Sequence, residues 1–244
     1  MSGHSKWNNI KKKKEKTDAQ KGRVFTKIGR EIAIAVKEGG SGDPASNSRL
    51  KEVIAKAKAN NVPNDNIERI IKKAIGEGST SHYEAVTYEG YGPCGVAVIV
   101  EALTDNRNRT AGDVRHYFDK FGGNMGAQGC VSFMFNKKGV LVMDSEDQDE
   151  DKVMEDSLEA GAIDFVADGD IFEIYTEPDD FWGVYNDLTA KGYKFESAEI
   201  EQVPDTYTAI GDEESVIKMQ KLLDILEENE DVQNVWHNWE NEGE

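Results

Sequence analysis

The segment GVLVMDSEDQDEDKVMEDSLEAGAIDFVADGDIFEIYT, residues 139–176, decides the architecture of the second half of the chain. Its apolar residues change from a strand pattern to a helical one and back again, with a turn at Asp168-Gly169. With the residues that follow, the expected elements are a strand at 139–143, a helix at 150–160, strands at 163–167 and 171–176, a helix at 178–191 and a strand at 194–203. The order βαββαβ predicts a ferredoxin-like domain.

Helical periodicity dominates the N-terminal part of the chain. Apolar residues spaced three and four apart predict helices at 18–38 and 48–60, and a third helix that begins at a capping Asn64 and ends at Gly76. Asn47 is the expected N-cap of the second helix. Short loops between short helices predict a small bundle.

The residues between the bundle and the βαββαβ block alternate with the period of strands. Strands are expected at 83–89, 95–102 and 130–135, a helix at 110–121 with Thr110 and Asp113 as a capping box, and a terminal strand–helix–strand unit at 205–240. The terminal unit is too small for a core of its own, so we pair it with the middle part. The predicted fold is α+β and multidomain: 1–78 helical, 79–136 plus 204–244 discontinuous, and 137–203 inserted.

Charge is spread unevenly over the chain, whose formal net charge is −18. Residues 1–80 carry a net charge of +9, residues 81–143 are neutral, and residues 144–244 carry −27. The acidic half should repel nucleic acid, so phosphate contacts are expected on the other parts. No stretch has the apolar length of a membrane span or a signal peptide, and a cytoplasmic location without a membrane partner is expected.

The most basic stretch is GHSKWNNIKKKKEKTDAQKGRVFTKIGR, residues 3–30, in which Glu15 and Asp18 are the only acids. A close run of lysines repels itself unless a polyanion neutralises it, and an aromatic side chain among cations can stack on a base. Nucleic acid is therefore favoured as its partner over a merely solvated tail. The expected contact residues are Lys6, Trp7, Lys11, Lys12, Lys13, Lys14, Lys16, Lys21, Arg23, Lys27 and Arg30.

A second candidate anion site is TDNRNRTAGDVRH, residues 104–116. Arg107 and Arg109 lie near the start of a predicted helix, where an anion is stabilised. The alternative is that these arginines pair with the abundant carboxylates of the protein itself, and the residues do not choose between the two.

Other patterns do not indicate catalysis. GYGPCG, residues 90–95, matches GxGxxG but lies between two strands, so a hairpin with glycines at positive φ is favoured over a phosphate loop. DSEDQDED, residues 144–151, lacks the glycine of a calcium loop. The four histidines and two cysteines have no metal-like spacing. We expect no enzymatic activity, no cofactor and no metal.

Several motifs together resemble the YebC/PmpR family. They are GHSKWNNIK (3–11), KGRVFTKIGREI (21–32), GDP (42–44), NVPNDNIERIIKKA (61–74), YEGYGPCGVAVIVEALTDNRNR (88–109) and VSFMF (131–135). The resemblance implies three domains, with the third inserted in the second. It also implies one of two functions: a DNA-binding transcriptional regulator, or a translation factor that acts on the ribosome and relieves stalling at proline-rich stretches. Lys12-Lys13-Lys14 departs from the His-Arg-Lys that relatives often have.

The leading hypothesis is a non-enzymatic, nucleic-acid-binding regulator of gene expression, with DNA as the first target. Ribosomal RNA, or the ribosome itself, is the alternative partner, and a protein-interaction module acting through its acidic face is the second alternative. Lysine contacts to backbone phosphates predict weakly sequence-specific binding. The residues leave the oligomeric state open.

Overall fold

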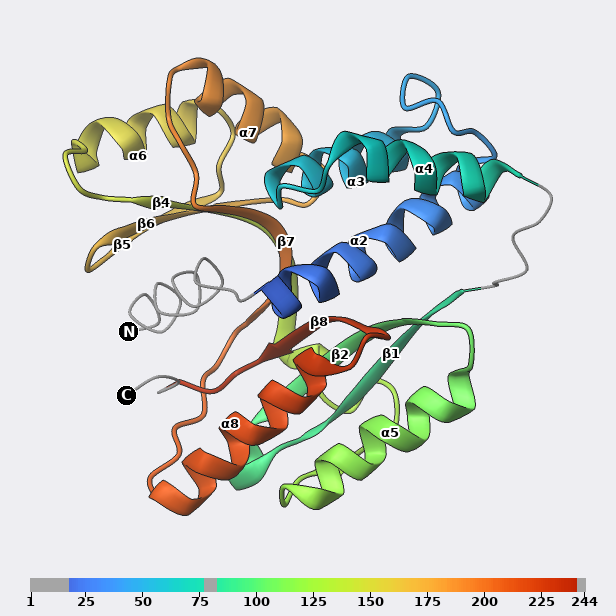
Figure 1. Cartoon of the computed structure of the whole chain (residues 1–244). Coiled ribbons are helices and arrows are strands. Elements are labelled where there is room, and N and C mark those ends of the chain that lie inside the picture. Colours follow the sequence, from blue (N-terminus) through green and yellow to red (C-terminus); the bar gives the residue numbers. More distant parts are fainter. Residues whose placement is uncertain (1–17, 77–82, 241–244) are drawn as a thin grey trace.

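A computed structural model of the chain describes residues 18–76 and 83–240, without the side chains of residues 18–21 and 59 (Figure 1). The predicted α+β, multidomain fold is confirmed: a group of N-terminal helices is followed by two antiparallel sheets, each with helices on one face. None of the described helices is both long and apolar enough to cross a bilayer.

The N-terminal helices are α2 (Asp18–Gly39), α3 (Ser48–Ala59) and α4 (Asn64–Ile75). Both sides of the Asn47 amide hold the start of α3: its oxygen accepts a 3.0 Å hydrogen bond from the Leu50 amide, and its nitrogen donates to Ala35 O of α2. Asn47 is thus confirmed as the N-cap. The prediction of Asn64 as a cap was wrong, because Pro63 occupies the cap position and no side chain caps α4.

The helical core is formed by the apolar stripes that the period of 3.6 predicts. Buried side chains from all three helices and from the loop before α4 contribute to it: Ile28, Ile32, Ala35, Val36, Leu50, Val53, Ala57, Val62 and Ile67.

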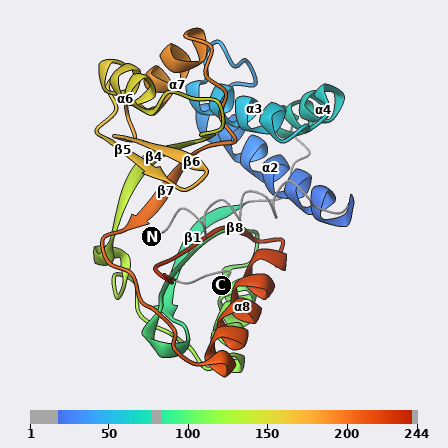
Figure 2. The same cartoon turned by 90° about the vertical axis from the view of Figure 1, so that its left-hand side faces the viewer.

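The middle sheet has the strand order β3-β1-β2-β8. Its strands are β1 (Glu84–Tyr91), β2 (Ala97–Thr104), β3 (Asn124–Met125) and β8 (Val232–His237), and all neighbours are antiparallel. Helices α5 (Arg107–Lys120) and α8 (Glu213–Glu228) pack on one face of it (Figure 2). Strand β8, from the C-terminal part of the chain, pairs with β2, as a middle domain formed by two separate segments requires. The exact domain boundaries stay a prediction.

Several local predictions in this part were wrong at their ends. Helix α5 starts at Arg107, because Asn106 rather than Thr110 caps it and accepts from the Arg109 amide. The strand expected near 205 is only an isolated bridge between Thr208 and Trp239. In the β1–β2 hairpin, positive φ is found at Cys94 and Gly95, whereas Gly90 lies within β1.

Of the strand expected at 130–135, only Phe135 lies in a strand, as the first residue of β4 (Phe135–Asp144). Residues 130–134 form a loop with a 3-10 turn at Ser132–Met134. The cause is the buried Glu89 of β1, whose carboxylate accepts 2.8–2.9 Å hydrogen bonds from the amides of Gly129, Val131 and Ser132. Backbone amides that converge on one carboxylate cannot also form a straight ladder with a neighbouring strand.

The second sheet has the order β5-β6-β4-β7 and is antiparallel throughout, which confirms the ferredoxin-like order. Its elements are β4 (Phe135–Asp144), α6 (Glu150–Glu159), β5 (Asp164–Asp168), β6 (Ile171–Thr176), α7 (Phe181–Ala190) and β7 (Ser197–Pro204). Strands β4 and β7 stay paired from Phe135–Pro204 to Val142–Ser197, so this sheet begins before residue 137.

Candidate nucleic-acid interface

The basic residues of α2 form a row along one side of the helix. Arg23, Lys27 and Arg30 are spaced four and three apart, which places their side chains on neighbouring turns of one face. In Figure 1 this helix lies across the end of the middle sheet, next to β8 and the C-terminal end of α8.

The row contacts the acidic end of α8 and the turn that follows it. Arg23 forms a 3.1 Å ion pair with Glu228, and Lys27 Nζ donates a 2.8 Å hydrogen bond to Glu227 O. The carbonyl at a helix end carries partial negative charge, so a lysine there is favoured. These two contacts are exposed and salt can screen them.

Arg30 makes the most buried of these contacts, with 14% of its side chain exposed. Its guanidinium donates to Asp231 Oδ1 at 2.8 Å, to the backbone carbonyl of Glu230, and to Glu230 Oε2 at 3.3 Å. It also lies over the ring of Tyr83, 5.5 Å from the ring centroid. Arg30 therefore holds α2 against the turn between α8 and β8.

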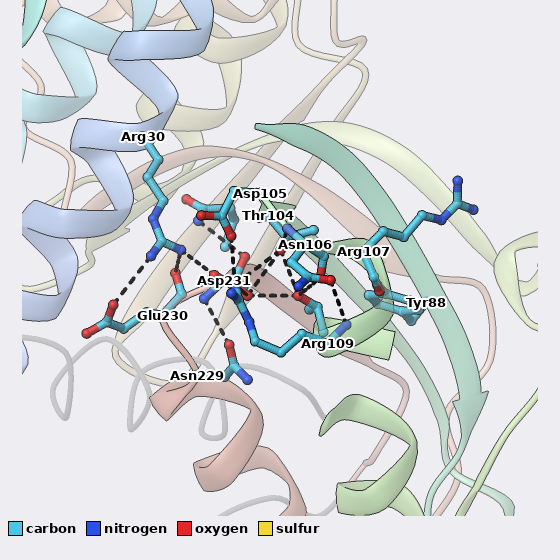
Figure 3. Close-up of polar contacts among 12 residues, drawn as sticks. Arg30, Tyr88, Thr104, Asp105, Asn106, Arg107, Arg109, Asn229, Glu230 and Asp231 are labelled. Carbon is cyan, nitrogen blue, oxygen red and sulfur yellow. Dashed lines mark hydrogen bonds and ion pairs between the residues drawn. The ribbon is translucent and has the colours of Figure 1, made fainter. Parts of the chain in front are cut away.

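Asp231 is the centre of this junction, as Figure 3 shows. While Oδ1 binds Arg30, Oδ2 accepts from Arg109 at 2.7 Å, from Thr110 at 2.8 Å and from Thr104 at 3.2 Å. Burial alone would raise the pKa of Asp231, but the hydrogen bonds from Arg109 and Thr110 outweigh it and hold the pKa below its ordinary value. One carboxylate thus joins α2, β2, α5 and β8.

Arg109 and Arg107 behave differently although they are two residues apart. Hydrogen bonds to Asp231 and Asp105 raise the pKa of Arg109. They also hold the Arg109 guanidinium against two carboxylates of the protein itself. Arg107 is exposed, and Figure 3 shows its guanidinium pointing away from the junction. Its carbonyl accepts a 3.3 Å hydrogen bond from the Tyr88 hydroxyl. Of the two, Arg107 alone presents its charge outward.

Two surface hollows are acidic and do not suit phosphate. One, of about 490 Å³, is lined by Glu89, Glu101 and Gln202 among others. Burial raises the pKa of Glu101 there, and a hydrogen bond from Asn234 partly offsets this. The other, of about 560 Å³, lies beside α6 and is lined mainly by aspartates and two lysines. Among the described residues no three His, Cys, Asp or Glu side chains group as a metal site would require.

Two family models together match nearly the whole chain. The TACO1/YebC protein N-terminal domain matches residues 5–77, and the TACO1/YebC second and third domain matches residues 83–239.

The chain belongs to the TACO1/YebC family.

Similar proteins include a "Probable transcriptional regulatory protein" of Acetivibrio thermocellus, 62% identical over 98% of this chain and 99% of its own length. One of the same name from Finegoldia magna is 59% identical over 99% and 100%. A crystal structure of a conserved hypothetical protein from Aquifex aeolicus covers 92% of both chains with 45% identity and a TM-score of 0.82. The predicted family is confirmed, and the solved relative has the same fold.

In this TACO1/YebC chain, some of the predicted site residues lie outside the described residues. These are Lys6, Trp7, Lys11, Lys12, Lys13, Lys14 and Lys16, while Lys21 belongs to α2 but its side chain is not described. The structure brings Arg30 and Arg109 together on Asp231, with Arg23 and Lys27 at the adjoining end of α8. Arg107 lies apart from them.

The residues that sequence reasoning missed are of two kinds. The first is the acidic partners of α2, above all Asp231, which resembles any other acid of the C-terminal half. The second is Lys51, Lys58 and Lys73 on α3 and α4, which are exposed and form no ion pair with another described residue. Lys51 and Lys58 are seven residues apart on one helix face, a signal that the sequence does contain.

Proposed function

We propose that this protein is a non-enzymatic, nucleic-acid-binding regulator of gene expression. The observation that carries the proposal is the separation of charge along the chain: +9 in residues 1–80 against −27 in residues 144–244. The two surface hollows described above carry carboxylates, which supports the N-terminal part as the place where a polyphosphate binds. The regulatory name of the relatives from Acetivibrio thermocellus and Finegoldia magna supports the same function.

The contacts divide the basic residues into two roles in this proposal. The lysines of residues 6–16 bind phosphates and Trp7 stacks on a base, while Lys51, Lys58 and Lys73 extend the cationic surface over α3 and α4. Lys21 extends it at the start of α2, and Arg107 is a further outward charge. Arg23, Lys27 and Arg30 have a second role: they fix the helical domain to the end of α8 and to the turn at Asp231. Arg109 holds the same Asp231 carboxylate from α5 of the middle domain.

A binding assay on the full chain tests this proposal. Fluorescence anisotropy with a duplex DNA and with an RNA hairpin, each at several salt concentrations, measures affinity and its salt dependence. For about six phosphate contacts to a duplex, log K should fall against log salt with a slope of about −5. DNA is the expected tighter target, and tighter binding of the hairpin would move the proposal to structured RNA.

Two variants identify the residues involved. Replacing Lys11, Lys12, Lys13 and Lys14 by Ala should weaken binding to all sequences alike and flatten the salt slope by about 3 to 4 units. The matched control replaces Lys194 and Lys221, two exposed lysines of the acidic half, and should leave both unchanged. Equal effects of the two variants, or no salt dependence in the wild type, would contradict the proposal.

A further inference from the structure

Exposed apolar side chains gather at one end of the ferredoxin-like domain. Among the described residues nine large hydrophobic side chains are exposed, and four of them lie between residues 154 and 166. They are Met154, Leu158, Ile163 and Val166, with 38%, 50%, 45% and 39% of their surface exposed. Scattered apolar residues are normal on a surface, but a local group of them marks an interaction site.

The group is built by α6 and β5. Met154 and Leu158 are four residues apart, so they occupy one side of α6, while Val153 and Ser157 point into the core. Ile163 directly precedes β5, on the same side as Phe165, which packs in the core beneath the helices. Val166 lies within β5 on the opposite face of the sheet, so the group beside α6 consists of Met154, Leu158 and Ile163. In Figure 2 α6 lies above β5 at the outer end of the domain.

Strand β5 is an edge of the second sheet. Within the described strands it has one hydrogen-bonded neighbour, β6, so its other side offers backbone groups to a further strand. An extended peptide added to such an edge gains main-chain hydrogen bonds, and pockets or patches beside the edge select its side chains.

The charge around the group selects the kind of partner. Residues 144–170 contain twelve Asp and Glu and only one basic residue, Lys152. Nucleic acid and anionic lipid headgroups are repelled by such a surface. A second copy of the chain that used the same face would bring two acidic segments together, because a two-fold contact pairs like with like.

We propose that the surface formed by α6 and β5, the α6–β5 surface, binds a basic polypeptide segment with interspersed apolar side chains. The segment lies extended along β5, its lysines or arginines meet the surrounding carboxylates, and its apolar side chains cover Met154 and Leu158. This surface is separate in sequence and charge from the lysines proposed to bind nucleic acid, so each proposal can fail without the other.

The test uses the full chain and a fluorescent ten-residue peptide of alternating lysine and valine. Anisotropy measures its affinity, and amide hydrogen exchange measures protection at 163–168. The double variant Met154→Ser/Leu158→Ser removes apolar surface without a change in charge. It should weaken peptide binding about tenfold or more, whereas Ile217→Ser, at a 46% exposed position on α8, should not.

Control peptides separate the two parts of the recognition. An alternating lysine–serine peptide should bind more weakly than the lysine–valine peptide, and a glutamate–valine peptide should not bind. The proposal is overturned if the lysine–serine peptide binds as tightly, if both variants behave alike, or if β5 gains no protection. It is also overturned if sedimentation shows that the unliganded chain self-associates through this surface, with association lost in the double variant.

Discussion

Replacing Asp231 by Asn tests the junction that joins the N-terminal helices to the middle domain. An amide has one acceptor oxygen in place of two. Whichever way it turns, its NH₂ group faces a donor, either Arg30 on one side or Arg109 and Thr110 on the other. The Asp231→Asn substitution therefore removes at least one charge-assisted hydrogen bond, in a site where only 8% of the Asp231 side chain is exposed.

The expected loss follows from these contacts. A hydrogen bond to a charged group is worth about 1.5–3 kcal/mol, and orphaning a buried charge entirely costs about 3–5 kcal/mol. The arginines are not orphaned, since Arg30 keeps Glu230 and Arg109 keeps Asp105. We expect the free energy of unfolding to fall by about 2–3 kcal/mol, between these limits.

The pH dependence gives the result its specific signature. The folded-state pKa of Asp231 is lowered, so its stabilisation is present above the unfolded pKa of about 3.9 and is lost as pH falls through the folded value. The difference between wild type and Asp231→Asn should therefore be full at pH 7 and shrink below about pH 4.

Urea unfolding at several pH values measures the loss of unfolding free energy and its pH dependence. Amide hydrogen exchange of α2 measures whether the helix is held less firmly. Asp119→Asn, at an exposed position on α5, is the matched control and should stay within about 0.5 kcal/mol of wild type. If Asp231→Asn unfolds at the same urea concentration as wild type at pH 7, or α2 exchanges no faster, the carboxylate does not hold the junction.

Three further substitutions probe other parts of the fold. Glu89→Gln weakens the acceptor of three backbone amides, so unfolding free energy should fall by about 1–3 kcal/mol and the loop should exchange faster; unchanged exchange would contradict this. Gly90→Ala places a Cβ 2.6 Å from a backbone oxygen of β3, so the free energy of unfolding, measured by thermal melts, should fall by about 1–3 kcal/mol. The control is Gly112→Ala on α5, where the new Cβ has open space, and it should be neutral or stabilising in the same melts. Among the described residues Arg23 has one ion pair, the exposed one with Glu228. Arg23→Ala should therefore cost less than about 1 kcal/mol at low salt, and a larger or salt-independent loss would refute the exposed-pair interpretation.

Periodicity predicted the elements whose stability is local. The apolar stripes of α2 and α3 fix both the type and the position of these helices, because one side of each helix is buried and the other is exposed. The ferredoxin-like order followed from the sequence of elements alone, since few topologies accommodate βαββαβ.

Contacts between distant residues were beyond prediction. Arg30 was expected to face phosphate, yet its partner is a carboxylate about 200 residues away. No local pattern distinguishes Asp231 from the other acids of the C-terminal half, since its burial arises only when β8 pairs with β2. The strand expected at 130–135 was wrong for residues 130–134. The amides of Val131 and Ser132 donate to the side chain of Glu89 on β1, about 40 residues away, which no local pattern reveals.

The pairing of β4 with β7 has a consequence for how the molecule is built. The chain leaves the middle domain along β4 and returns to it along β7. These two strands are hydrogen-bonded neighbours, and Asn136 lies directly opposite Val203. Paired strands are about 5 Å apart, which a two-residue turn can span. We therefore expect that the predicted insert can be exchanged or removed by rejoining the chain at this one strand pair, provided that Phe135, which packs on Ala97 and Ile99 of the middle sheet, is kept.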